Sequence, residues 1–288
     1  DGRLVAGWSL PGHQPRGAAA VSAEVYEQAV EASEGAGVVA VHMSRRLSGT
    51  WSAARLAAEK FSGLVRVVDS RSVGLAVGFT AIAAAQAAAA GADRDRVYES
   101  AIRQAATVES LLCVHSLDNL RNSGRISAAG KMLGSALSIK PILHMVDGSL
   151  TLRERHRTFT KAIDKMAEAA IDAAGGRAVT VGVQHCQAPV LADEFRAKVE
   201  SQLRVVTSSL TADLGPVLGC HVGPGAIGIV VAVVLSVLLY RGAIRMNFHT
   251  FFLYTGIFLI FVAAGILAYG VAALQAYGWL PGLNNLAF

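Results

Sequence analysis

Acidic side chains are missing from the last part of the sequence. Residues 226–288 contain no Asp or Glu, and their only charged side chains are those of Arg241 and Arg245. Residues 1–225 contain all 21 acidic residues and 24 of the 26 basic ones, so their charges nearly balance. The formal net charge of +5 therefore does not come from a basic patch. Because no stripe of Lys and Arg with interleaved aromatic residues occurs, we predict no nucleic-acid partner.

Cysteine is scarce, and its spacing matches no metal or disulfide motif. Cys113, Cys186 and Cys220 show no Cys-x-x-Cys pairing, which favours a reducing compartment. His185-Cys186 and Cys220-His221 are adjacent pairs, but neighbours on a strand point to opposite faces, so each pair could offer only one ligand to an ion. Without zinc-finger spacing or His-Glu-x-x-His, we predict no metal site.

Catalytic and targeting motifs are missing too. No paired carboxylates, phosphate loop or catalytic cysteine appears, and Ser48 lies in Leu-Ser-Gly-Thr instead of the Gly-x-Ser-x-Gly elbow of serine hydrolases. We therefore predict that the chain is not an enzyme. It begins at Asp1 without an initiating Met or a signal-peptide pattern, and we interpret it as a fragment.

The most informative stretch that is present is residues 38–61. An apolar, β-branched run at 38–43 predicts a strand covered on both faces, and a helix with one apolar face follows at 49–61. Ser48 is a good N-cap for this helix. Free amides at a helix start, beside the hydroxyls of Ser48 and Thr50 and at the end of a strand, favour a bound anion. An ordinary capped helix start is the alternative.

Strands and helices alternate through the first half of the chain, which predicts parallel βαβ units with right-handed crossovers. From about residue 109 the pattern changes, and Asp147 and Gly148 between two alternating runs predict a β-hairpin. We expect an α/β fold with a parallel βαβ domain at 1–108 and a mixed α/β domain at 109–231. The predicted helices are 22–34 (capped by Ser22), 49–61, 73–90, 95–108, 117–137, 158–174 and 189–203, and the further strands are 64–68, 111–115, 178–184, 205–208, 217–221 and 226–231.

Five motifs occur in a fixed order along the chain. They are LSGTWSAA, VRVVDSRSVG, LRNSGRISAA, KPIL followed by DG, and HVGPGAIG. Together they resemble the DegV family of fatty-acid-binding proteins, over about residues 1–230. The family's first strand has no counterpart here, and its Thr-Ser-x-Pro loop is matched only by Gly12-His13-Gln14-Pro15. The resemblance therefore implies an N-terminally truncated DegV-like fold.

The resemblance also implies a function. A DegV-like protein holds a long-chain fatty acid in a slot between its two domains and presents the carboxylate to a separate fatty acid kinase. The fatty acid is its ligand, and no cofactor is expected. Because the kinase needs ATP, the lipid-binding part is expected in the cytoplasm.

The family motifs assign the site residues. The lipid carboxylate is expected at Ser48, Gly49, Thr50 and His221. Arg125 of the Gly-Arg-Ile motif is expected at the rim of the slot, in contact with the kinase, because a guanidinium binds oxyanions through two parallel hydrogen bonds. Arg71, and with less support Lys140, would complete this rim. Without the resemblance, His221 is better interpreted as a capping residue and Arg125 as a solvated one.

Two uncharged runs, 222–240 and 251–274, are each long enough for a membrane helix, which needs about 20 apolar residues. The first run includes the predicted strand 226–231, and the same residues cannot form both this strand and a membrane helix. The second is a good membrane helix, with small residues for close helix packing and Trp279 at a probable interface. We therefore predict a C-terminal transmembrane segment within 232–288.

This tail resembles the last membrane helices of the oxidase-dependent iron permease family. The Arg-Glu-x-x-Glu motifs that carry the iron chemistry of that family do not occur here. The main hypothesis is a DegV-like lipid-binding protein that is joined near 230–234 to a permease fragment and associates with the membrane through it. The alternative is a membrane iron-permease fragment, active in iron ion transport, with an accessory soluble domain.

Overall fold

The computed structural model describes residues 18–126 and 139–233. All of them belong to the first of two compact units, Asp1–Ser236. The predicted membrane helix at 251–274 and nearly all of the predicted segment 232–288 lie outside the described residues. Within 18–126 and 139–233, no helix combines the length and the apolar character that crossing a membrane requires.

A small parallel sheet follows the first helix, α1 (Ala18–Ala32). It consists of β1 (Val38–His42) and β2 (Val65–Asp69), which are connected through α2 (Thr50–Ala58) and the short 3-10 helix η1 (Glu59–Phe61). This is the predicted βαβ unit. Val38 and Ala40 pack into one apolar cluster with residues of α1 and α2, while Val39 and Val41 pack into another with residues of α3 (Leu75–Ala89) and α4 (Arg94–Ala106). The prediction of a strand covered on both faces is confirmed.

The larger sheet has six strands in the order β5-β4-β3-β8-β6-β7. Only β6 and β7 run parallel, and the other neighbours are antiparallel, so the sheet is mixed as predicted. The predicted hairpin is confirmed, because Asp147 and Gly148 have the positive φ values of 48° and 81° that a two-residue turn of this kind requires. The strands are β3 (Val108–Cys113), β4 (Lys140–Val146), β5 (Ser149–His156), β6 (Ala178–His185), β7 (Val205–Asp213) and β8 (Ile227–Val233).

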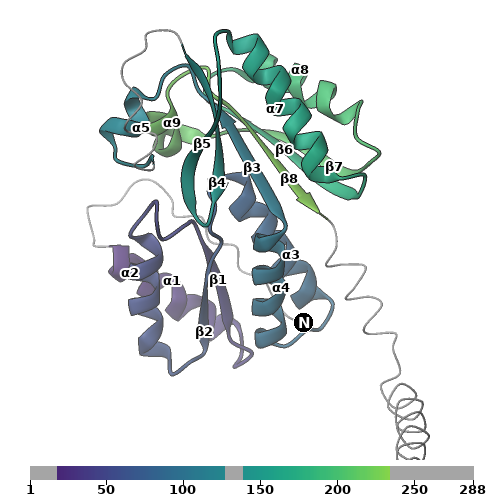
Figure 1. Ribbon diagram of the computed structural model, residues 1–288. Helices are drawn as coiled ribbons and strands as arrows, with labels where there is room; N and C mark the ends of the chain where they lie inside the picture. Colours follow the sequence, from purple (N-terminus) through teal and green to yellow (C-terminus); the bar gives the residue numbers. More distant parts are fainter. Residues whose placement is uncertain (1–17, 127–138, 234–288) are drawn as a thin grey trace, which may run out of the picture. The chain divides into compact units, whose positions relative to one another are not determined.

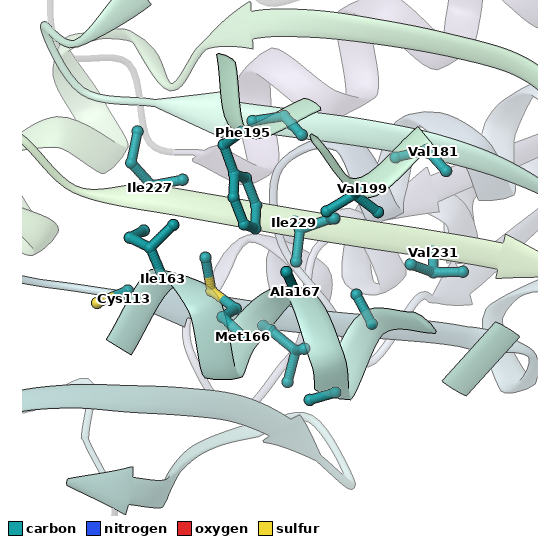
Figure 2. Packing of buried hydrophobic residues seen from close by; sticks show 14 of the residues in the cluster. Cys113, Ile163, Met166, Ala167, Val181, Phe195, Val199, Ile227, Ile229 and Val231 are labelled. Carbon is teal, nitrogen blue, oxygen red and sulfur yellow. The ribbon is translucent and has the colours of Figure 1, made fainter. Parts of the chain in front are cut away.

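The core of this sheet lies around β8, whose seven residues are all buried. Helices α7 (Phe159–Ala174) and α8 (Pro189–Glu200) lie across one face of the sheet (Figure 1). On that face, Met166 of α7 and Phe195 of α8 lie close to Ile227 and Ile229 (Figure 2). On the other face, Val230 packs in a cluster with residues of α3. β8 therefore has helices on both sides.

Helix α3 packs against both sheets. Its first half places Phe79 in the cluster with Val230 of the large sheet, and its second half places Ala84 in the cluster with Val68 of the small sheet. Gly182 of β6 allows the close approach, because a Cβ there would lie 2.7 Å from Leu75 Cδ1. The backbone N–H of Leu75 also donates to Gln184 Oε1 of β6 at 2.7 Å. This helix therefore joins the two sheets.

Two predictions about helices and strands are wrong. α1 begins at Ala18, so Ser22 lies inside the helix and does not cap it. The predicted strand 217–221 is part of a helix, α9 (Gly215–Val222), which has Pro216 in its first turn. Of the helix predicted at 117–137, the structure describes α5 (Asp118–Asn122), and residues 127–138 lie outside the described ranges.

Candidate functional site

The hydroxyl-rich turn follows β1 and begins at a buried serine, Ser44. The backbone N–H groups of Leu47 and Ser48 donate to the Ser44 carbonyl at 3.0 and 3.1 Å. Gly49, in a helical conformation, occupies the N-cap position of α2, so the assignment of Ser48 as N-cap is wrong by one residue. The Ser48 hydroxyl still accepts from the Thr50 N–H at 3.2 Å and also hydrogen-bonds the Thr50 hydroxyl.

Gly49 itself is exposed, and a Cβ built on it would meet no atom within 4 Å. No neighbouring group of the protein therefore requires glycine at this position. The side of the turn that bears Gly49 is open, and the first amides of α2 point along the start of the helix, where negative charge is favoured.

Ser44 connects this turn to two other loops. Its N–H donates to the Ser72 carbonyl at 2.8 Å, and its hydroxyl donates to the Gly148 carbonyl at 2.6 Å. The loop of Arg71 and the tip of the β4–β5 hairpin therefore meet at the hydroxyl-rich turn. Arg71 adopts a left-handed conformation with φ 50°, and its N–H donates to Asp69 Oδ1 at 2.9 Å. The structure thus brings Arg71 and the Ser48–Thr50 turn to one corner of the molecule.

Arg125 also lies at this corner. Its Nε donates to the carbonyl of Leu47 at 3.3 Å, and its Nη1 donates to the carbonyl of Ser123. The predicted rim arginine is therefore in direct contact with the residue before Ser48. Lys140 lies elsewhere, because its Nζ donates to the carbonyl of His115 at 3.1 Å.

Two further arginines, Arg45 and Arg46, flank the turn and were missed by the sequence analysis. Arg45 pairs with Asp69 at 3.4 Å and lies over the Trp51 ring at 5.5 Å, while Arg46 Nη1 donates to Ser149 Oγ at 3.5 Å. The available signal was the Arg-Arg pair that follows the strand at 38–43 after one residue, Ser44. Arg46 adds positive charge beside the turn, whereas the charge of Arg45 is balanced by the Asp69 carboxylate.

Two buried donors at this corner lack a partner. Within the described ranges, neither Trp51 Nε1 nor Ser72 Oγ has a hydrogen-bond partner. A buried polar group without a partner costs about 1–3 kcal/mol, so such groups usually mark a ligand, an ordered water or a strained site. Trp51 follows Thr50, and Ser72 contacts Ser44 through its carbonyl. Both residues therefore neighbour the hydroxyl-rich turn, Trp51 in sequence and Ser72 through the hydrogen bond to Ser44.

His221 lies in the last turn of α9 and is half-buried. In the part of the chain that the structure describes, it makes no hydrogen bond or ion pair with the Ser48–Thr50 turn. The turn that follows α9 packs tightly elsewhere: a Cβ on Gly223 would lie 2.8 Å from Asn119 Nδ2, and one on Gly225 would lie 2.6 Å from His115 Nε2.

A shared apolar cluster nevertheless lies next to both regions. We call it the Leu120 cluster. Leu47, next to Ser48, and Val222, next to His221, both pack against it. The hydroxyl-rich turn and the histidine thus flank one apolar region. The buried members of the cluster are Val114, Leu117, Leu120, Ile126, Leu143, Leu150, Cys186 and Ala226.

A separate cavity of about 430 Å³ lies at the end of β6 and β7, beside α9. Cys186, Asp213 and Cys220 contribute to its wall, and Asp213 Oδ2 lies 3.2 Å from His185 Nδ1. Among residues 18–126 and 139–233, no three His, Cys, Asp or Glu side chains are grouped to hold a metal ion. No motif of the sequence predicted this cavity.

Comparison with protein families gives two matches. The model described as an uncharacterised protein of the DegV family matches residues 14–234, and the model of the iron permease FTR1 family matches residues 205–288. The two matches overlap at 205–234. In the structure, β7 and β8 of this overlap are strands of the six-stranded sheet, and α9 is the helix between them.

Individual relatives agree with the first match. A DegV domain-containing protein of Mycobacterium tuberculosis is 42% identical over 208 residues, which are 72% of this chain and 74% of the relative. One from Streptomyces coelicolor is 39% identical over 210 residues, 73% of this chain and 74% of that protein.

Solved structures of the same family are similar to this fold. A DegV family protein from Corynebacterium glutamicum has a TM-score of 0.71 at 34% identity, covering 75% of this chain and 82% of its own. One from Thermus thermophilus, described as binding fatty acid, has a TM-score of 0.71 at 29% identity, covering 75% and 77%. DegV of Bacillus subtilis, described as a fatty acid binding protein, has a TM-score of 0.66 at 28% identity, covering 75% and 76%.

Proposed function

Since the chain belongs to the DegV family, we propose that it binds a long-chain fatty acid in a slot between its two α/β domains and is not itself an enzyme. The carboxylate binds at Ser48, Gly49 and Thr50, with His221 as a further donor. The acyl chain lies against apolar side chains. Relatives described as fatty acid binding proteins support this assignment.

The observation that carries the proposal is the arrangement around the Leu120 cluster. Polar donors of the hydroxyl-rich turn and of α9 flank this one apolar region, as an amphipathic ligand requires. Removing an acyl chain from water stabilises the complex by about 0.8 kcal/mol per CH₂ group, which makes the chain the main source of affinity.

The electrostatic surroundings favour an anion at the turn. Trp51 Nε1 and Ser72 Oγ, which have no hydrogen-bond partner among residues 18–126 and 139–233, are available to donate to a carboxylate. Hydrogen bonds to a charged group are about twice as strong as neutral ones. Arg46 and Arg125 add positive charge within the same corner. A neutral ligand would use none of this charge.

Arg125 and Arg71 lie at the rim and present the carboxylate to a separate fatty acid kinase. Both side chains are on loops at the corner where the carboxylate binds, and a guanidinium suits a phosphoryl group or an acidic partner surface. This function requires the cytoplasm, where ATP is available. The tail within 232–288 attaches the chain to the membrane.

The iron permease FTR1 match favours a second candidate, a permease fragment with an accessory domain. Within that match, β7 and β8 belong to the six-stranded sheet, and residues 232–288 contain no Arg-Glu-x-x-Glu motif. We therefore assign the permease-like residues to membrane attachment.

The first test is direct identification of the ligand. The full 288-residue chain, purified and extracted with organic solvent, is expected to release a long-chain fatty acid that mass spectrometry identifies. A ligand-free preparation is expected to take up palmitate or oleate. A chain that carries no acyl ligand and takes up neither acid would contradict the proposed function.

A second test separates binding from presentation. Ser48→Ala removes one hydrogen bond to a charged group, so we expect fatty acid affinity to fall by about 1.5–3 kcal/mol, roughly tenfold to 150-fold. Ser52→Ala, at an exposed position of the same helix, is the matched control and should leave the affinity unchanged. Isothermal titration with oleate measures both.

Arg125→Ala is expected to have the opposite pattern. It should leave oleate affinity close to that of the wild type while reducing phosphorylation of the bound acid by the kinase, because the guanidinium serves the rim. Arg125→Lys keeps the charge but loses the planar fork and should restore phosphorylation only in part. Equal losses of affinity in Ser48→Ala and Arg125→Ala would show that this division of roles is wrong.

A further inference from the structure

Two cysteines from distant parts of the chain line one cavity. Cys186 directly follows β6, and Cys220 lies in α9. Both contribute to the wall of the 430 Å³ cavity, together with Asp213, Pro216 and Gly219. The proposed lipid function does not use either thiol.

The side chain of Cys186 faces Gly219 of α9, the residue that precedes Cys220. A Cβ built on Gly219 would lie 3.1 Å from Cys186 Sγ, so the glycine leaves room for the sulfur against the helix. The side chain is nine-tenths buried, with 8% exposed. Cys220 is exposed, and its thiol donates to the Val217 carbonyl at 3.0 Å.

We propose that Cys186 and Cys220 form a reversible thiol–disulfide pair that fastens α9 to the end of β6. A disulfide requires Cα atoms about 4.4–6.8 Å apart and side chains that point toward each other. Because the Cys220 thiol now donates to the Val217 carbonyl, its side chain must leave Val217 and turn into the cavity when the bond forms. The cavity provides the space for this movement.

The order of the two steps follows from exposure. Cys220 attacks one oxygen of a peroxide, which gives a sulfenic acid and releases water when the peroxide is hydrogen peroxide. The sulfur of Cys186 then attacks the sulfenic sulfur, the S–S bond forms, and a second water leaves. The two thiols lose two electrons and two protons in total, and the peroxide is reduced to two waters. Burial and, secondarily, the Asp213 carboxylate raise the pKa of Cys186, which suits the resolving role better than the first attack.

The bond also affects the proposed lipid site. His221 follows Cys220 directly, Val222 packs against the Leu120 cluster, and Cys186 belongs to that cluster. Turning Cys220 inward rotates this end of α9 and withdraws His221. Oxidation is therefore expected to lower fatty acid affinity by roughly tenfold to 150-fold, the effect of one hydrogen bond to a charged group. This consequence rests on the proposed function, whereas the thiol pair does not.

The test uses the full chain, treated with hydrogen peroxide, alkylated and mapped by peptide mass spectrometry. The expected result is one intramolecular Cys186–Cys220 bond that dithiothreitol reverses. Cys113, which is fully buried and whose pKa burial raises to about 12, should remain a thiol and serves as the internal control. Cys113→Ser should behave as the wild type, and Cys220→Ser should leave Cys186 reduced. A Cys220 that ends as a sulfonic acid or as an intermolecular disulfide, with Cys186 still a thiol, would overturn the proposal.

Oleate affinity of the oxidised and reduced wild type tests the link to the lipid site. The expected loss should be absent in Cys220→Ser. If the disulfide forms and the affinity does not change, the link through α9 is wrong. If the reduced protein binds no fatty acid, the proposed function fails, and the mapping experiment alone decides whether the thiol pair exists.

Discussion

Replacing Phe195 with alanine is expected to lower the free energy of unfolding by about 3–5 kcal/mol, the usual range for truncating a buried phenylalanine. The Phe195 side chain is 2% exposed and lies between α8 and β8, next to Met166 and Ile229 (Figure 2). Its removal leaves a cavity beside the central strand of the large sheet. Urea-induced unfolding of the full chain, followed by circular dichroism, measures the loss.

Val190→Ala is the matched control for this prediction. Val190 lies in the same helix but is 71% exposed, so its truncation should change the free energy of unfolding by no more than about 0.5 kcal/mol. Similar losses in the two variants would mean that α8 does not pack on the sheet as described here.

Gly74→Ala is expected to have the second largest effect, a loss of about 2–5 kcal/mol in the free energy of unfolding from two additive causes. Gly74 has φ 64° and ψ −136°, a conformation that is strained for any residue with a side chain. An added Cβ would also lie 2.0 Å from Gln184 Oε1 and would displace the side chain that accepts from Leu75 N–H. Because this hydrogen bond joins α3 to β6, we also expect a lower affinity for fatty acid.

A second glycine of the same region provides the control. Gly78 lies inside α3, and a Cβ there would meet no atom within 4 Å. Gly78→Ala should therefore stabilise the protein by about 0.5–1 kcal/mol, since alanine is the better helix former. Gln184→Ala, which removes the hydrogen bond without backbone strain, should give an intermediate loss. If Gly74→Ala were as stable as Gly78→Ala, the contact between α3 and β6 would not hold the two sheets together.

Local patterns in the sequence were sufficient to predict much of the fold. The β-branched run at 38–43 and the Asp147-Gly148 turn each depend on neighbouring residues alone, and both predictions are confirmed. The strand order of the large sheet was not predicted, because it depends on pairings such as Cys113 with Ile227 that lie far apart in the chain. The domain boundaries at 108 and 231 remain predictions.

The prediction for 217–221 failed for a physical reason. A run of five mostly apolar residues fits a buried strand and a short helix equally well, because neither period can be recognised over that length. Pro216 was the signal that the sequence analysis missed, since proline is favoured in the first turn of a helix. The same error affected Cys220 and His221, which were interpreted as neighbours on opposite faces of a strand and lie instead on adjacent positions of a helix.

The candidate site was predictable only in part. The hydroxyls of Ser48 and Thr50 follow one another in sequence, so a local pattern was enough to predict their turn. The contact between Arg125 and Leu47 joins residues 78 positions apart, and only the family motifs suggested that Arg125 belonged near the site. The connecting role of buried Ser44 depends on two loops that no local pattern relates to it. The role of each residue toward a lipid stays a prediction.

The central position of β8 has a consequence for protein synthesis. β8 lies between β3 and β6 and is the last strand of this sheet to leave the ribosome. At roughly 5–20 residues per second, the roughly hundred residues between Cys113 and Ile227 take on the order of 5–20 s to translate. During this interval β3 has no partner at the edge that β8 later occupies, and β6 lacks the same partner from its own synthesis until β8 is made. The nascent chain therefore exposes two open strand edges, and a chain terminated before Ile227 would keep them and would be prone to aggregate.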